Sequence, residues 1–131
     1  MAKREFSYKG KTLGELKSMS NADFAKLLPS RQKRSLLHGV NREVDKKVGE
    51  ALKANDKGKI IRTHRRDAIV TPKMIGLKFG IHSGKEFQVV EIQKEMLGHR
   101  LGEFVLTRKK LKHGKAGIGA TKSSTAITAR G

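Results

Sequence analysis

The chain has 131 residues, of which 36% are apolar, so it can bury one modest hydrophobic core but not two. The 30 Lys and Arg outnumber the 12 Asp and Glu, and the net charge of +18 makes a polyanion, above all nucleic acid, the leading partner. The absence of Cys excludes disulfides and thiolate metal sites. The apolar runs are too short to cross a bilayer and no secretory signal is visible, so we expect a cytoplasmic protein.

The N-terminal part of the chain predicts a basic leader followed by two short helices. Residues 3–11 are basic with two aromatic residues interleaved, which fits either a docking arm or a solvated leader. Leu13 and Leu16 begin a short helical pattern. Ser20 is a predicted N-cap for a second helix, and Pro29 ends that helix.

A third helix is predicted over residues 31–38. Ser30 is its candidate cap, Leu36 and Leu37 are expected to turn inward, and its basic residues are expected to turn outward. Gly39 suits its C-terminal exit, where glycine is favoured.

A fourth helix has the strongest helical pattern in the chain. Its apolar residues recur every four positions, at Val40, Val44, Val48 and Leu52. This spacing predicts an apolar stripe that covers one face of a sheet. Acids mix with bases on its other side, which favours a solvated face over a recognition helix.

An extended segment is predicted from Ile60, after a loop at 55–58. It runs into the stretch 63–67, where His64 is flanked by three bases, Arg62 on one side and Arg65 and Arg66 on the other. We expect this stretch to emerge on a surface that meets phosphate. Pro72 suits the first position of a short helical turn.

Two strands and a tight turn organise the chain. Apolar residues alternate with polar or small ones on both sides of Ser83-Gly84, the predicted two-residue turn. The alternating apolar residues are Leu77, Phe79, Ile81, Phe87 and Val89. The alternation predicts that they share one face of the sheet. Residues 95–104 then predict a short helical turn that leads into a third extended segment.

The chain past Thr107 changes character. Residues 108–131 hold seven Lys and Arg and no acid, with little apolar periodicity. Such a segment cannot offset the entropy of ordering itself, so we expect a tail that is mobile alone and ordered on a polyanion. The predicted division is therefore a helical N-terminal extension with its packing helix over 1–58, a sheet-containing core over 59–107 and a basic tail over 108–131.

Catalytic and cofactor motifs are incomplete. Residues 114–121 imitate a phosphate-binding loop, but Ala120 stands where the lysine is needed. The histidines lack zinc-ligand spacing, and no nucleophile elbow is present. We therefore expect no enzyme and no cofactor. A chromosomal or transcriptional DNA-binding protein and a phosphotransfer enzyme remain the alternatives.

Several motifs identify a family. Residues 97–107, read as LGHRLGEFVLT, resemble the signature of the universal small-subunit ribosomal protein family numbered nineteen in bacteria. The segments 63–67, 72–76 and 83–85 with the apolar residue at 92 fit the same pattern. The tail and the helical N-terminal extension resemble the archaeal and eukaryotic branch, numbered fifteen in eukaryotes, and the short loop at 55–59 favours an archaeal origin.

The resemblance implies a fold and a location. The fold is α+β, with a small three-stranded sheet, a packing helix, a helical N-terminal extension and a flexible basic tail. The location is the head of the small ribosomal subunit, on 16S-type ribosomal RNA, in the cytoplasm. The implied neighbours are a head protein of the family numbered thirteen in bacteria, bridge elements of the large subunit, and A-site tRNA or mRNA at the decoding site near the tail.

The candidate RNA-binding residues are bases and histidines of the second half of the chain. Arginine bridges phosphates bidentately, whereas lysine acts as a point charge. The candidates are Arg62, His64, Arg65, Arg66, Lys73, Lys85, His99, Arg100, Arg108, Lys109, Lys110, Lys112, His113, Lys115 and Lys122. If about 6 to 10 phosphates are neutralised, affinity falls roughly 10³- to 10⁵-fold between 50 and 200 mM salt.

Removal of residues 108–131 tests the division between folded part and tail. We expect weaker RNA binding and a shallower salt dependence, because several cations are lost, with thermal stability almost unchanged. Salt titrations of RNA affinity and thermal melts measure the two effects. A large loss of stability would contradict the division.

Overall fold

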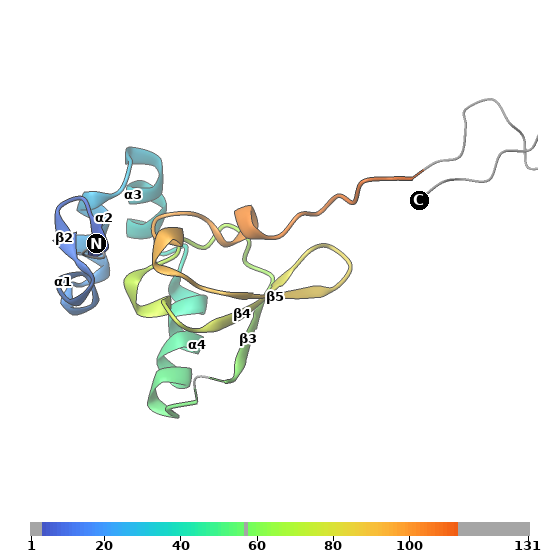
Figure 1. Ribbon diagram of the computed structural model, residues 1–131, viewed down its shortest axis with the longest axis horizontal. Coiled ribbons are helices and arrows are strands. Elements are labelled where there is room, and N and C mark those ends of the chain that lie inside the picture. The colour runs from blue at the N-terminus through green and yellow to red at the C-terminus, as the bar shows by residue number, and fades with distance from the viewer. Residues whose placement is uncertain (1–3, 57, 113–131) are drawn as a thin grey trace, which may run out of the picture.

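A small three-stranded sheet organises the fold in the computed structural model, which describes residues 4–56 and 58–112 (Figure 1). The strands lie in the order β3, β4, β5, with β3 parallel to β4 and β4 antiparallel to β5. Their bounds are Ile60–Thr63, Lys78–His82 and Phe87–Glu91. With the helices described next, this confirms the predicted α+β class and its three-stranded sheet.

The helices precede the sheet in the chain. They are α1 (Leu13–Ser18), α2 (Asn21–Leu27), α3 (Ser30–Leu37) and α4 (Arg42–Lys53). The predicted cap of α2 is confirmed, because the Ser20 side chain accepts a hydrogen bond of 3.2 Å from the Asp23 backbone N–H. At α3, Pro29 occupies the N-cap position, so the capping role expected of Ser30 was wrong.

The segment before α1 is folded onto the body of the protein. Strands β1 (Ser7–Tyr8) and β2 (Lys11–Thr12) form a small antiparallel hairpin. The side chains of Phe6 and Tyr8 pack against the hydrophobic core. Residues 4–12 are therefore a folded part of the protein, with Arg4, Lys9 and Lys11 exposed, and docking of these bases to a partner stays a prediction.

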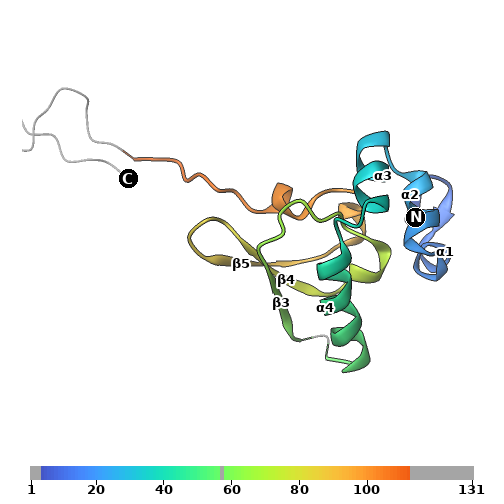
Figure 2. The ribbon, with the colours of Figure 1, turned by 180° about the vertical axis from the view of Figure 1, so that it is seen from behind.

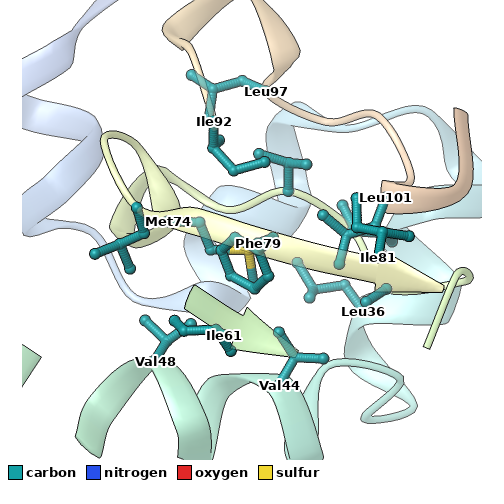
Figure 3. Close-up of a cluster of buried hydrophobic side chains, with 14 of the residues drawn as sticks. Leu36, Val44, Val48, Ile61, Met74, Phe79, Ile81, Ile92, Leu97 and Leu101 are labelled. Carbon is teal, nitrogen blue, oxygen red and sulfur yellow. The ribbon is translucent and has the colours of Figure 1, made fainter. Parts of the chain in front are cut away.

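Helix α4 supplies one layer of the core, as predicted. Val44 and Val48 are buried and face Ile61 of β3 and Phe79 of β4 (Figure 3). Leu52, expected on the same stripe, is 48% exposed. Val40 lies before α4, and two four-residue steps from Val44 turn the Leu52 side chain about 80° away from the buried face.

The two adjacent leucines of α3 also differ from the prediction. Leu36 is buried, but Leu37 is 57% exposed. Consecutive helical residues point about 100° apart, so a narrow contact buries only one of them.

The β4–β5 hairpin is confirmed, but the faces of its strands differ from the prediction. Residues 83–86 connect the strands, longer than the predicted Ser83-Gly84 turn, and Gly84 has a φ of +103°. Because this connection has an even number of residues, Phe79 pairs with Val90 and Ile81 pairs with Gln88. Phe87 and Val89 consequently lie on the face opposite Phe79 and Ile81, so the expectation that all four share the core face was wrong.

Residues 66–70 pair with residues 98–102 outside any regular strand. The backbone N–H and C=O of Val70 bond to His99 and Gly98, and Leu101 N–H donates to Ala68 C=O. On the opposite edge, the buried Asn41 side chain donates to Ile69 C=O at 2.7 Å and accepts from Ile69 N–H at 2.8 Å. The backbone groups of Ala68, Ile69 and Val70 named here are thus hydrogen-bonded although the segment belongs to no regular strand.

Short 3₁₀ turns complete the fold. They are η1 (Pro72–Met74), η2 (Lys94–Met96) and η3 (Leu101–Phe104). The turn predicted at Pro72 is confirmed, and η2 matches the turn predicted after residue 95. η3 also lies within the predicted turn at 95–104, but no strand follows it among residues 105–112, so the third extended segment expected there was wrong. None of the helices in the described ranges combines the length and apolarity needed to span a membrane.

Candidate nucleic-acid interface

A pocket rich in arginine lies between α3 and the segments around Asp67 and Arg100. We call it the arginine pocket. It is lined by Arg31, Arg34, Ser35, His38, Val40, Asp67 and Arg100. Three arginines and one histidine line the pocket against a single acid, so the pocket favours an anion.

Arg100 is fixed in this pocket by its own hydrogen bonds. Its guanidinium donates to Asp67 C=O at 3.0 Å and to the Ser35 hydroxyl at 3.3 Å. In contrast, the side chains of Arg31 and Arg34 are exposed on α3 and belong to no salt bridge among the described residues. The pocket therefore combines one oriented arginine with two that are available to a ligand.

Arg65 is partly committed to acids of the protein. Its Nε lies 3.3 Å from Glu43 Oε2, and its Nη1 lies 4.0 Å from Asp67 Oδ2. The hydrogen bond from Arg65, with the nearby charge of Lys47, lowers the pKa of the Glu43 carboxyl below its ordinary value. This ion pair is half exposed, so an external anion can compete with Glu43 for Arg65.

Arg66 is engaged inside the fold. Its guanidinium donates to the backbone carbonyls of His82 at 2.6 Å, Gly102 at 2.8 Å and Val105 at 2.5 Å. These bonds tie the end of β4 to the chain after η3. The structure thus gives Arg66 a positioning role, although its sequence context placed it among the phosphate-binding candidates.

The remaining candidates are spread over several surfaces. Arg62 and His64 belong to β3 and the residue beyond it, Lys73 is exposed on η1, and Lys85 is exposed in the hairpin connection. His99 is exposed, and its Nδ1 lies 2.7 Å from Glu103 Oε2. The structure therefore does not bring all of these candidates into one site.

The described part of the tail is a run of exposed cations. Arg108, Lys109, Lys110 and Lys112 are all exposed, and Lys109 Nζ lies 3.7 Å from Glu86 Oε1 of the hairpin. In Figure 2 this segment leads away from the helices and past the β4–β5 hairpin. The candidates His113, Lys115 and Lys122 lie outside the described residues, as does most of the tail predicted to be mobile.

The site list drawn from the sequence omitted the α3 side of the arginine pocket. Arg31 and Arg34 were predicted to face outward, but their approach to Arg100 joins positions about 70 residues apart in the chain. The basic run at 31–34 was the available signal.

In the described ranges, no group of three or more His, Cys, Asp or Glu is placed to hold a metal ion.

Comparisons with known proteins agree on one family. Residues 31–113 match the model of the family described as ribosomal protein S19. The chain is 49% identical over 123 residues to the small ribosomal subunit protein uS19 of Halobacterium salinarum. That alignment covers 92% of this chain and 88% of the archaeal protein.

Substitution of the two neighbouring arginines separates positioning from surface charge. Arg66→Ala leaves three carbonyls without their donor, and we expect a loss of about 2–4 kcal/mol in the free energy of unfolding. Arg65→Ala breaks a half-exposed ion pair, and we expect a loss below about 1 kcal/mol. Denaturant unfolding of the two variants measures the difference. Equal losses would contradict the role assigned to Arg66.

Proposed function

Because the chain belongs to the ribosomal protein S19 family, we propose that it is a structural constituent of the small ribosomal subunit and binds 16S-type ribosomal RNA. The observation that carries this proposal is the family match over residues 31–113 together with 49% identity to an archaeal relative. The relative's organism agrees with the archaeal type suggested by the motifs. The proposed role is architectural, in cytoplasmic ribosomes, and we assign no reaction to the protein.

The charge distribution supports RNA binding through the phosphate backbone. The net charge of +18 is far above what a protein of 131 residues needs for solubility. The arginine pocket and the exposed cations of 108–112 provide separate contacts for phosphates. RNA duplexes are read mainly by shape and backbone, so dispersed cations suit this ligand better than a single cleft.

We also propose the finer location that the family implies. The protein would lie in the head of the subunit, beside the head protein of the family numbered thirteen in bacteria and near a bridge to the large subunit. The tail would extend toward the decoding (A) site, within reach of tRNA or mRNA. The absence of acids from residues 108–131 supports a path along RNA.

Co-sedimentation tests the assignment to the ribosome. We expect the chain to remain with small subunits from its own cells after a high-salt wash, because many dispersed contacts and burial among RNA helices resist exchange. Quantitative detection across a sucrose gradient provides the measurement. Absence from the small-subunit fractions, or equal affinity for duplex DNA and ribosomal RNA, would favour a DNA-binding protein instead.

A double variant tests the arginine pocket. We expect Arg31→Gln with Arg34→Gln to reduce the salt slope of ribosomal RNA binding by about 1 to 2, because one phosphate contact is lost per arginine. We expect the affinity to fall by about 10-fold or more at low salt, which corresponds to a loss of about 1.4 kcal/mol or more in binding free energy.

The matched control removes the same charge elsewhere. Lys46 and Lys53 are exposed on α4 and do not line the pocket. We expect Lys46→Gln with Lys53→Gln to change affinity and slope less than the arginine variant. Equal effects would mean that total charge, and not the pocket, determines binding.

A further inference from the structure

The face of the sheet that points away from α4 carries an unusual set of side chains. We call it the outer sheet face. Alternation and the strand register place Ile60, Arg62, Lys78, Gly80, His82, Phe87, Val89 and Glu91 on it. Ile60 is 41% exposed and Val89 is 55% exposed, so within residues 4–56 and 58–112 no other element buries this face.

Three aromatic rings form a contiguous cluster at one end of the outer sheet face. The ring centroids of His64 and His82 lie 4.4 Å apart, with an interplanar angle of 34°. The Phe87 ring lies 5.0 Å from His64 and 4.9 Å from His82, in edge-to-face geometry with both. His82 ends β4, Phe87 begins β5 and His64 directly follows β3, so the sheet sets the spacing of the three rings.

Arginine extends this aromatic surface. The Arg62 guanidinium carbon lies 5.7 Å from the centroid of the Phe87 ring. Gly80 lies between the two strands that carry these residues, and a Cβ there would lie 3.3 Å from Arg62 Cγ and 3.2 Å from Ile60 Cγ2. The glycine thus leaves room for the Arg62 side chain to lie flat across the sheet.

Local hydrogen bonding orients the central ring. Gly84 N–H donates to His82 Nδ1 at 3.0 Å, so Nδ1 is the acceptor and the neutral ring carries its proton on Nε2. The hairpin therefore holds His82 in one orientation beside the rings of His64 and Phe87. A site whose rings are already fixed loses less conformational entropy when a flat ligand stacks on it.

The surrounding charges favour a polyanion as the occupant. Arg62 and Lys85 are exposed near the cluster, while Glu86 is neutralised in part by Lys109 at 3.7 Å. Glu91 and Lys78 are opposite each other at the far end of the sheet. An apolar protein segment would satisfy the rings but not the cations. An unpaired nucleotide satisfies both, because its base stacks and its phosphate accepts from arginine.

We propose that the His64–His82–Phe87 cluster binds an unpaired RNA nucleotide, with the base stacked on the rings and Arg62 on its phosphate. This inference rests on the proposed binding of ribosomal RNA and adds to it a contact with a base. The arginine pocket then contacts backbone phosphates, while the outer sheet face captures a nucleotide that has left its helix. Stacking is tolerant of sequence, so this contact selects unpaired structure and not a particular base.

The test uses the full-length chain with small-subunit ribosomal RNA and the variant Phe87→Leu. Leucine keeps the apolar side chain but removes the ring face. We expect affinity to fall about 5- to 100-fold, the range found when a stacked base loses its aromatic partner, with the salt slope unchanged. Ultraviolet crosslinking without a linker should attach a nucleotide to a peptide that contains His64, His82 or Phe87, and the variant should lose this product.

Two further variants make the outcome decisive. Phe104→Leu removes the same ring from a partly buried site on η3, outside the outer sheet face, and should keep both the affinity and the crosslink. His64→Gln changes an exposed residue without risk to the core, and it should weaken binding even if Phe87→Leu proves unfolded.

The possible results distinguish this inference from the proposed function. If Phe87→Leu and His64→Gln bind RNA with unchanged affinity and crosslinks, base stacking is overturned while ribosomal RNA binding stands. If crosslinking of whole small subunits joins the cluster to another protein, the occupant is a protein segment and the inference is also overturned. If the unmodified chain fails to bind ribosomal RNA at low salt, the proposed function itself fails.

Discussion

The fold depends on the placement of residues 66–70, a segment with no strand ladder of its own. One edge of it bonds to residues 98–102, the other edge bonds to the side chain of Asn41, and the guanidinium of Arg66 fastens its start to three carbonyls. A buried backbone without these partners would cost about 1–3 kcal/mol for each unpaired group. The family motif at 97–107 acts partly through this pairing, because a Cβ on Gly102 would lie only 3.0 Å from Arg66 C=O.

The same segment separates two surfaces of different chemistry. Asp67 lies in the arginine pocket on one side, and His64 lies in the ring cluster beside the β4–β5 hairpin. The proposed contacts differ accordingly, with phosphates at the pocket and an unpaired base at the rings. The hydrogen-bonded segment between them sets the spacing of the two proposed contacts, which favours recognition of RNA shape over recognition of sequence.

The use of arginine also shows how a highly charged chain folds at all. Arg66 donates hydrogen bonds to backbone carbonyls of the protein, and Arg100 is oriented by Asp67 C=O and the Ser35 hydroxyl. Arg31 and Arg34, in contrast, are exposed. Cations with internal partners stabilise the native state, whereas exposed cations repel one another until an anion binds. The positive charge therefore has two functions that composition alone does not distinguish.

Local signals in the sequence determined the helices, the cap at Ser20, the glycine of the β4–β5 turn and the family, because each depends on residues close together in the chain. Tertiary structure decided the rest. The outward placement of Phe87 and Val89 depends on which residues pair across β4 and β5, the exposure of Leu52 depends on the width of the contact made by α4, and the role of Arg66 depends on carbonyls up to 39 positions away. These are properties of pairing between distant segments, and the alternation of residue types along one segment does not encode them.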